Sequence, residues 1–448
     1  MDAGQRAPKN GGVCFMEKMF KLKEHGTTVG KEVAGGFTTF FAMAYIIFVN
    51  PNFLSQTGMD FNAVMLATCI SAAVGTAVTA LLANVPFAQA PGMGLNAFFT
   101  FTVCFGMGYT WQQALAIVFI SGLLFLAITV SPLRKQVIDA IPAPLKNAIS
   151  AGIGLFIALV GLLNAGIVVA DGNLLDLGNI TSGAPLLALI GLLVTGILMA
   201  CGVKAAMLIG ILVTTVIGIP MGLTTLPGEI TLSGVSLAPT FMQMDFGGLL
   251  SMGVLPLITA IVTFTICDMF DTVGTLIGTA GNAGMLNEKG ELPHGDRALI
   301  ADAVATCAGA CLGTSTVTTF VESSTGISEG ARTGFSSLVV SLCFLASCVL
   351  APVAGIIPGA ATAPALIIVG ILMLKSAARI DWSDFEIAMP CFLTIAMMPF
   401  AYSITDGIGF GFISWVVIKV FRGKFKEVPV LMYILSLLFV LMYILSNL

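Results

Sequence analysis

The chain has 448 residues, of which 57% are hydrophobic and only 9% are charged. A soluble globular protein carries roughly 25% charged residues, so this composition excludes one. The 19 Lys and Arg against 23 Asp and Glu give a net charge of -4, and nucleic acid is excluded as a partner because no basic face is present to bind phosphate. We therefore expect one integral membrane domain.

The cysteine and histidine pattern contains no metal or redox motif. The ten cysteines include no CxxC, and neither His25 nor His294 has a second ligand at metal-binding spacing. Nucleophile–base pairs are missing as well, so we predict neither a cofactor nor an enzyme. The polar stretch that ends at Lys31 lacks the features of a cleaved signal peptide.

Apolar segments of membrane-spanning length follow one another along the chain. A helix needs about 20 apolar residues to cross a bilayer core about 30 Å thick. The first half contains segments at 37–55, 61–83, 93–108, 112–131, 145–170, 184–201 and 204–222. The second half contains segments at 250–268, 298–311, 314–328, 335–357, 361–375, 386–402 and 405–421.

The charges of the loops predict the orientation of these fourteen segments. If the N-terminus is cytoplasmic, every basic residue falls on the cytoplasmic side or at its rim, from the cluster 18–31 to the cluster 419–426. The opposite loops carry only acidic residues. This separation follows the positive-inside rule, so we predict a multi-pass protein of the cell membrane with a cytoplasmic N-terminus.

A fifteenth apolar run, residues 428–448, is harder to place. It contains the near-repeat LMYILS at 431–436 and 441–446. A fifteenth crossing puts the C-terminus outside, whereas amphipathic packing keeps it at the inner surface. The sequence does not decide between the two.

The fourteen segments divide at the loop 223–249 into two halves of seven. An odd number per half gives the halves opposite orientations, and such inverted repeats are typical of secondary transporters with a site near the bilayer midplane. The dipeptide Ile-Pro precedes both the fifth and the twelfth segment, at Ile141 and Ile357. We therefore predict an all-α polytopic membrane protein of 7+7 inverted repeats.

Two segments in corresponding positions are broken. The third, around residues 90–101, is interrupted by Pro91, Gly92 and Gly94, and its counterpart at 315–330 is rich in Ser, Thr and Gly. Non-helical backbone at membrane depth is tolerated only where it is buried in protein or lines a cavity, so this pair indicates the transport site. Two loosely packed helices with small-residue interfaces are the alternative.

Three acidic residues lie within apolar segments. They are Asp268 and Asp271 in TFTICDMFDTVGT and Glu322 in FVESSTG. A charge in the bilayer costs roughly 3 kcal/mol or more and therefore marks a functional candidate, and no Lys or Arg within a span pairs with these acids. Helix capping or a position at the cytoplasmic rim is the alternative for the aspartates, and backbone contacts for Glu322. Asn96, at the break of the third segment, is either a site residue or a turn residue.

Four motifs carry a family resemblance. They are EVAGGFTTFFAMAYIIFVNP from Glu32, APGMGLNAFF from Ala90, DMFDTVGTLIGTAG from Asp268 and VESSTGISEGARTG from Val321. Together they resemble the nucleobase:cation symporter (nucleobase-ascorbate transporter) family, and most closely its AzgA-like hypoxanthine/guanine permease branch. The resemblance runs in register to about Phe421 and leaves the last segment out.

The resemblance implies a core domain of segments 1–4 and 8–11, a gate domain of segments 5–7 and 12–14, and short antiparallel strands in segments 3 and 10. It also implies a homodimer. In this chain the parts are the cytoplasmic N-terminus 1–31, core 32–135 and 250–357, gate 136–249 and 358–427, and the C-terminal hydrophobic segment 428–448.

The resemblance also implies roles for residues. The family's segment-8 acid corresponds to Asp268, the further acid of the AzgA-like branch to Asp271, the segment-10 acid to Glu322 and the segment-3 polar residue to Asn96. An aspartate at 268, where the xanthine and uracil branches usually have Glu, favours the oxopurine branch.

The acidic residues and the broken segments together suggest one mechanism. A purine edge presents N–H donors, and carboxylates accept hydrogen bonds from them. We therefore expect Glu322 and Asp268 to hold the edge, assisted by Asn96 and by the backbone near Ser323 and Ser324. Phe98 is the candidate for stacking on the ring, with Phe99 and Phe320 as alternatives.

We expect Asp268, tuned by Asp271, to carry the coupling proton, with H+ favoured over Na+. The predicted function is import of hypoxanthine or guanine by proton symport with an elevator-like movement. Transport of xanthine or adenine is left open. An anion carrier or channel on the same fold is the alternative, for which a basic residue or bare helix N-termini at the site would be expected.

Overall fold

The computed structural model describes residues 17–171, 174–225, 236–287 and 292–446. The first seven predicted segments are α2 (Val29–Met43) with α3 (Ile46–Leu54) and η1 (Ser55–Thr57), α4 (Phe61–Leu82), β1 (Gln89–Pro91) with α5 (Met93–Ala97) and η2 (Phe98–Gly106), α6 (Trp111–Val130), α8 (Ala143–Asn164), α9 (Gly183–Ala200) and α10 (Ala206–Gly218). A short helix, α7 (Leu133–Ala140), links α6 to α8.

The second half has the same organisation. Its segments are α11 (Val254–Asn282), α12 (Gly295–Leu312), β4 (Val317–Thr319) with α13 (Ser323–Ser328), α14 (Gly334–Ser347) with η3 (Cys348–Leu350) and α15 (Ala351–Ala354), α16 (Gly359–Leu374) with η4 (Lys375–Arg379), α17 (Phe385–Phe400) and α18 (Ile404–Phe421). The turn η5 (Phe425–Glu427) leads to α19 (Val430–Ser446). The predicted polytopic fold of two seven-segment halves is confirmed, with eight of the described helices long and apolar enough to cross a membrane.

Polar side chains start several of these helices. The carboxylate of Asp60 accepts a hydrogen bond from the Ala63 N–H and caps α4. At α6 the side chains of Thr110 and Gln113 form a reciprocal capping box. These contacts satisfy backbone N–H groups that the helix itself leaves without partners.

Helix α11 is longer than predicted. The predicted segment ended at residue 268, but the helix continues to Asn282, so Asp268 is its fifteenth residue of 29. The prediction of this boundary was wrong because it took the end of the apolar run for the end of the helix. The suggestion that Asp268 caps a half-helix is also wrong.

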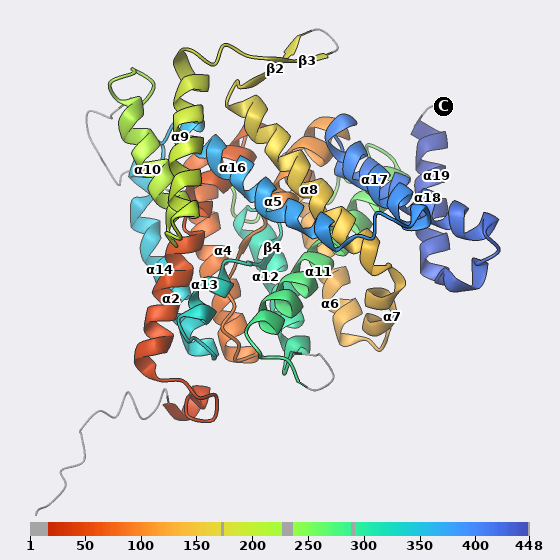
Figure 1. Cartoon of the computed structure of the whole chain (residues 1–448), viewed down its shortest axis with the longest axis horizontal. Coiled ribbons are helices and arrows are strands. Elements are labelled where there is room, and N and C mark those ends of the chain that lie inside the picture. The colour runs from red at the N-terminus through yellow and green to blue at the C-terminus, as the bar shows by residue number, and fades with distance from the viewer. Residues whose placement is uncertain (1–16, 172–173, 226–235, 288–291, 447–448) are drawn as a thin grey trace, which may run out of the picture.

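The two broken segments meet in a two-stranded sheet at the centre of the molecule (Figure 1). Strands β1 and β4 are antiparallel, with Gln89 opposite Thr319, Ala90 opposite Thr318 and Pro91 opposite Val317. The predicted strands in segments 3 and 10 are thereby confirmed. A second hairpin, β2 (Val168–Asp171) with β3 (Leu174–Leu177), follows α8 and was not predicted.

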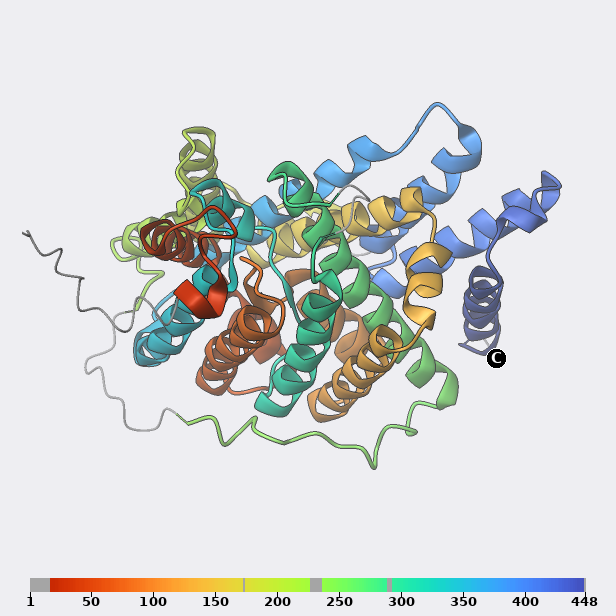
Figure 2. The same ribbon diagram turned by 90° about the horizontal axis from the view of Figure 1, so that it is seen from below.

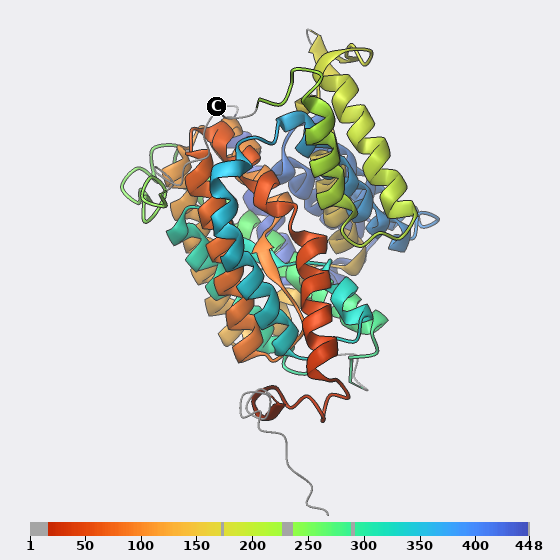
Figure 3. The same cartoon turned by 90° about the vertical axis from the view of Figure 1, so that its left-hand side faces the viewer.

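The helices pack into two bundles (Figures 2 and 3). In the first bundle α14 packs on α2 and α4, and α12 packs on α4 and α6 beside α11. In the second bundle α8 packs on α16 and α17, α17 on α18, and α9 on α10 and α16. The first bundle contains segments 1–4 and 8–11 and the second contains segments 5–7 and 12–14, but their movement as a core and a gate stays a prediction.

Helix α19 runs antiparallel to α18. The hydroxyl of Tyr433 near the start of α19 donates to the Phe425 carbonyl (3.0 Å), and that of Tyr443 near its end donates to the carbonyl of Asp406, at the far end of α18 (3.4 Å). The end of the molecule where α2 begins is termed the inner side and the end with the β2–β3 hairpin the outer side; α19 ends toward the outer side (Figures 1 and 3). The structure thus favours a fifteenth crossing.

Candidate functional site

Asp268 lies in the middle of α11, behind strand β4. Its side chain is 1% exposed, and its Oδ2 accepts a hydrogen bond from the hydroxyl of Thr306 on α12 (2.9 Å). In this conformation the carboxyl is covered, so direct contact between Asp268 and a substrate stays a prediction.

Threonine hydroxyls close the free edges of the central sheet. Because Val317 and Pro91 face each other in a pair without a ladder hydrogen bond, the N–H and C=O of Val317 point away from β1. The N–H of Val317 donates to the Thr306 hydroxyl (3.2 Å), which lies 3.1 Å from the Val317 carbonyl. On the other strand the N–H of Gln89 donates to the Thr76 hydroxyl (2.9 Å), which in turn donates to the Gln89 carbonyl (3.0 Å). At membrane depth no water is available to satisfy such edges.

A further buried acid, Asp302 on α12, completes the cluster. Its Oδ1 accepts hydrogen bonds from Gln89 Nε2 (3.1 Å), the Thr272 hydroxyl (2.8 Å) and the Thr319 hydroxyl (3.2 Å). Asp302 was not predicted from the sequence, although an acid within the apolar segment 298–311 is a signal of the same kind as Asp268. Gln89 and Thr272 gave no such signal.

The two buried aspartates have unused acceptors. Asp268 Oδ1 and Asp302 Oδ2 are both buried without a hydrogen-bond partner among the described residues. The two carboxyl groups interact electrostatically with each other and with Asp271. Like charges at such close range favour the uptake of a cation, and a proton is the smallest one. The described residues contain no group of three or more His, Cys, Asp or Glu that could hold a metal ion.

Asp271 faces open space. It is exposed, and its Oδ2 lies 3.4 Å from the Thr318 hydroxyl of β4. Gly274 and Gly278 follow on the same face of α11, and a Cβ added at either would meet no atom within 4 Å. This open face continues toward the inner end of α11.

Glu322 lies at the start of α13, in the second broken segment. The carboxylate is half-buried, and its Oε1 accepts a hydrogen bond from the hydroxyl of Tyr45 (2.9 Å), a residue that is 2% exposed. Glu322 also interacts electrostatically with Asp271. The structure therefore brings the three predicted acids into one cluster, and it adds Tyr45 and Asp302.

The other predicted site residues are buried beside the cluster. Asn96 accepts a hydrogen bond from the Ser315 hydroxyl and ties the first broken segment to the second. The hydroxyl of Ser323 accepts from the Ala88 N–H (3.0 Å). The ring of Phe98 packs edge-on against Phe264 with centroids 4.5 Å apart and is buried. Stacking of Phe98 on a substrate stays a prediction.

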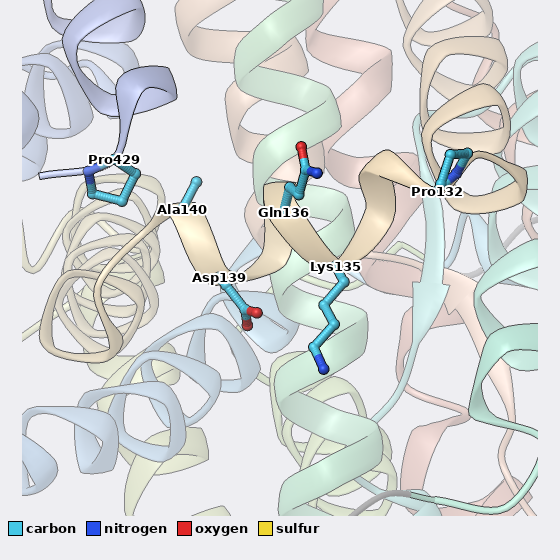
Figure 4. A pocket seen from close by; sticks show the side chains of 6 residues that line it. All are labelled: Pro132, Lys135, Gln136, Asp139, Ala140 and Pro429. Atoms are coloured by element: carbon cyan, nitrogen blue, oxygen red, sulfur yellow. The ribbon is translucent and has the colours of Figure 1, made fainter.

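A hollow elsewhere in the molecule is separate from the cluster. It encloses about 520 Å³ between α7 and the residues before α19 (Figure 4), and its lining residues are Pro132, Lys135, Gln136, Asp139, Ala140 and Pro429. None of the predicted site residues lines it. The site is therefore the acidic cluster around the β1–β4 sheet.

Comparison with known proteins identifies the family. Residues 30–410 match the family model Xan_ur_permease, described as a permease family. The chain belongs to this nucleobase permease family. Among its relatives, the guanine/hypoxanthine permease PbuG of Bacillus subtilis is 45% identical over 96% of this chain and 99% of that protein. The adenine permease AdeP of Escherichia coli is 42% identical over 98% of each chain.

The fold of this permease extends to proteins with little sequence similarity. The transmembrane domain of the cyanobacterial bicarbonate transporter BicA matches with a TM-score of 0.61 at 15% identity, over 87% of this chain and 97% of that one. This likeness concerns the fold alone. As a member of this permease family, the protein is a transport protein and not an enzyme.

Proposed function

We propose that this permease imports an oxopurine nucleobase, hypoxanthine or guanine, together with a proton across the cell membrane. The observation that carries the proposal is the division of four carboxyl groups around one sheet. Asp271 and Glu322 are accessible, whereas Asp268 and Asp302 are buried with unused oxygen atoms. The relatives PbuG and AdeP, both purine permeases, support the substrate class.

The accessible pair suits the edge of a purine. When ionised, Glu322 and Asp271 accept hydrogen bonds and donate none. Hydrogen bonds from purine N–H groups to such carboxylates are charge-assisted. The Tyr45 hydroxyl already occupies one side of Glu322 Oε1 and fixes its orientation. Asp268, Asn96 and Ser323 remain predicted contacts of the purine, which form in a closed, loaded state. Phe98 remains the predicted stacking residue.

The buried pair suits a proton. Asp268 and Asp302 interact through space and have one unpartnered oxygen each among the described residues. A proton bound by Asp268 removes one negative charge from this pair in the apolar interior, where charge is costly. The loaded first bundle then crosses the membrane barrier with less charge. Asp271 tunes the pair through its own charge.

Movement follows from the two bundles. In this proposal the first bundle is the core, residues 32–135 and 250–357, and the second is the gate, residues 136–249 and 358–427. The core slides against the gate like an elevator, with the N-terminus in the cytoplasm and two copies forming a homodimer. One contact between the bundles is that of the Lys146 Nζ with the Phe270 ring, at 4.9 Å.

An anion carrier is the alternative, since BicA, which shares the fold, is a bicarbonate transporter. Anion binding requires positive charge or bare helix N-termini at the site. Here the cluster is made of carboxylates and hydroxyls, and the Lys146 ammonium donates to the Ile138 carbonyl instead. The charge at the site therefore favours a neutral N–H donor over an anion.

Uptake into proteoliposomes tests the proposal. Labelled hypoxanthine uptake is measured with and without an inward proton gradient for the unaltered protein, Asp268→Asn and Glu322→Gln. Glu24→Gln, an exposed acid outside the cluster, is the control. We expect gradient-driven uptake that both cluster variants lose and the control keeps. Wild-type hypoxanthine affinity in Glu322→Gln contradicts the binding role, and the absence of saturable purine uptake in the unaltered protein contradicts the proposed substrate.

A further inference from the structure

The hydroxyl of Thr306 has more neighbours than it has hydrogen atoms. It lies 2.9 Å from Asp268 Oδ2 and 3.1 Å from the Val317 carbonyl oxygen, and it accepts the Val317 N–H at 3.2 Å. A threonine hydroxyl has one hydrogen to donate and two lone pairs to accept with. It therefore donates fully to Asp268 or to Val317, but not to both at once.

The protonation state of Asp268 decides between these acceptors. An ionised carboxylate attracts the hydroxyl hydrogen more strongly than a neutral carbonyl does, because the bond is charge-assisted. When Asp268 binds a proton on Oδ2, the carboxyl donates to Thr306, and the Thr306 hydrogen turns to the Val317 carbonyl. The only atom added is the proton, and it stays on the Asp268 carboxyl.

We propose that Thr306 is the positioning residue that links the proton on Asp268 to strand β4. With Asp268 protonated, Thr306 holds Val317 by both its N–H and its C=O, and the strand edge is fully hydrogen-bonded. With Asp268 ionised, the Val317 carbonyl loses this donor. Strand β1 cannot replace this donor, because the Val317 carbonyl points away from β1.

The direction of this link matches symport. Strand β4 carries Thr318, whose hydroxyl is 3.4 Å from Asp271 Oδ2, and it leads into Glu322. A proton on Asp268 therefore orders the strand that positions both accessible carboxylates. Because coupling between two ligands is reciprocal, a bound purine that orders β4 raises the affinity of Asp268 for its proton. This inference rests on the proposed function.

The groups that face this link are few among the described residues. Asp271 and Cys267 lie on the same helix as Asp268, and Asp302 and Cys307 come from α12 with Thr306. Strand β4 itself contributes only backbone and hydroxyl groups. Helix α6, which packs against α11 and α12, has no charged residue. Asp271 and Asp302 change the pH at which Asp268 binds its proton, but they do not contact the Thr306 hydroxyl in place of Asp268.

The other half of the molecule offers a matched control. Thr76 on α4 holds the N–H and C=O of Gln89 in β1 as Thr306 holds those of Val317 in β4. The two threonines lie in segments 2 and 9, which correspond in the two halves, and both are buried. Within the described part of the chain, the Thr76 hydroxyl bonds Gln89 and no acid. Thr76→Val therefore removes the same kind of strand contact from a hydroxyl that bonds no acid, while the Gln89 side chain keeps its own hydrogen bond to Asp302.

The test is the pH dependence of hypoxanthine binding to the purified full-length protein in nanodiscs, between about pH 5 and pH 8. The variants are Thr306→Val, Thr306→Ala, Thr306→Ser and Thr76→Val. We expect the unaltered protein and Thr306→Ser to bind more tightly at low pH, with about a tenfold change in Kd. Thr306→Val and Thr306→Ala are expected to lose affinity and to vary less than twofold with pH. Thr76→Val is expected to lose affinity but to keep the tenfold pH change.

Two results overturn the link. If Thr306→Val, or Thr306→Ala where the Val variant does not fold, keeps the full pH dependence, the hydroxyl does not transmit the proton. If Thr76→Val loses the pH dependence as completely as Thr306→Val, the effect belongs to strand packing. Failure of the proposed function has a different signature, because then the unaltered protein itself shows no hypoxanthine binding or no change with pH.

Discussion

At the scale of single residues, the contact between Tyr45 and Glu322 is the most specific polar contact of the accessible site. The tyrosine is buried where α2 gives way to α3, and its hydroxyl reaches across to the other half of the chain. A hydrogen bond to a charged group contributes about 1.5 to 3 kcal/mol. Tyr45 thereby orders the carboxylate before a substrate arrives, and binding then costs less entropy.

Tyr45→Phe tests this arrangement, because it removes one hydroxyl and keeps the ring. We expect the KM for hypoxanthine to rise about tenfold, which corresponds to about 1.4 kcal/mol, with the maximal rate changed less than twofold. Uptake kinetics in proteoliposomes measure both. Tyr433→Phe, whose hydroxyl bonds a carbonyl at the inner surface, is the control. An unchanged KM in Tyr45→Phe means that Glu322 is oriented by other contacts.

Acids in apolar segments were predictable from the sequence, whereas their partners were not. Asp268, Asp271 and Glu322 stand out because charge is rare at membrane depth. Tyr45, Gln89, Thr272 and Thr306 are ordinary residues of their segments, and they gain a role only when segments far apart in the chain meet. Asp302 was visible by the same rule as Asp268 and was overlooked.

At the scale of secondary-structure elements, the first broken segment touches the second bundle through a glycine. A Cβ added at Gly94 in α5 would lie 2.5 Å from Cγ2 of Ile153 in α8. Real carbon atoms do not approach so closely, so a side chain here forces the bundles apart. In the proposed elevator movement, a small residue at this point lets the two bundles slide past each other.

Gly94→Ala is therefore expected to slow transport. Overpacking of this kind costs about 1 to 3 kcal/mol, which predicts a loss of roughly tenfold or more in the rate of hypoxanthine uptake. Adding Ile153→Ala, which removes the colliding methyl group, should restore much of the rate. Gly196→Ala on α9, where an added Cβ meets nothing within 4 Å, is the neutral control. Failure of the double variant to recover activity excludes the steric explanation.

The order of the elements was largely predictable, and their ends were not. Hydrophobic length and the breaks at Pro91, Gly92 and Gly94 predicted the segments and the central strands, because the bilayer imposes both constraints. The continuation of α11 past Asp268 escaped this reasoning, since helix geometry tolerates polar residues that face protein. The β2–β3 hairpin lies in the loop between α8 and α9, outside the apolar segments, where hydropathy does not predict secondary structure.

At the scale of the whole molecule, α19 places the two ends of the described chain, near residues 17 and 446, on opposite sides. It begins after the inner turn at η5 and ends beside the outer start of α18. Its 17 residues extend about 26 Å, close to the thickness of the hydrocarbon core. A protease added to intact cells should therefore remove an epitope fused after Leu448 and leave one at the N-terminus. Protection of both epitopes contradicts a spanning α19.

The outer contact between the bundles is aromatic. Phe101 of the first bundle meets Phe156 and Tyr402 of the second, with ring centroids 6.3 and 5.5 Å apart, and Phe156 and Tyr402 are 5.2 Å apart. All three pairs are edge-to-face, a favoured geometry. Because Asp271, Gly274 and Gly278 are open toward the inner side, we predict that this triad is the outer barrier to the substrate.

Tyr402 holds its ring there at a conformational cost. It occupies the position after the end of α17 with φ +53°, while the N–H groups of Tyr402 and Ser403 bond the Pro399 and Met398 carbonyls. This is the Schellman motif, in which glycine usually takes the left-handed position. A bulky residue there costs about 1 to 3 kcal/mol. This strain is comparable to the two edge-to-face contacts that Tyr402→Gly and Tyr402→Asn remove, so these variants should leave the Tm nearly unchanged.

The same variants should release the outer contact. Loss of one edge-to-face pair between the bundles, about 1 kcal/mol, raises the population of the outward-open state about fivefold. A reporter cysteine at Thr362, a buried residue that bonds Asn52 between the bundles on the outer side, should react about fivefold faster with an impermeant maleimide added outside. With Tyr402→Phe, which keeps the ring, the Thr362→Cys reporter should be labelled at the same rate as in the protein with Tyr402.

A second reporter, Gly274→Cys on α11, measures access from the inner side. Its labelling from that side should not become faster, since the first bundle, which carries it, moves away from the inner side in the outward-open state. Faster labelling of both reporters indicates general loosening, and equal labelling of Thr362→Cys in all variants shows that the triad is not the outer barrier.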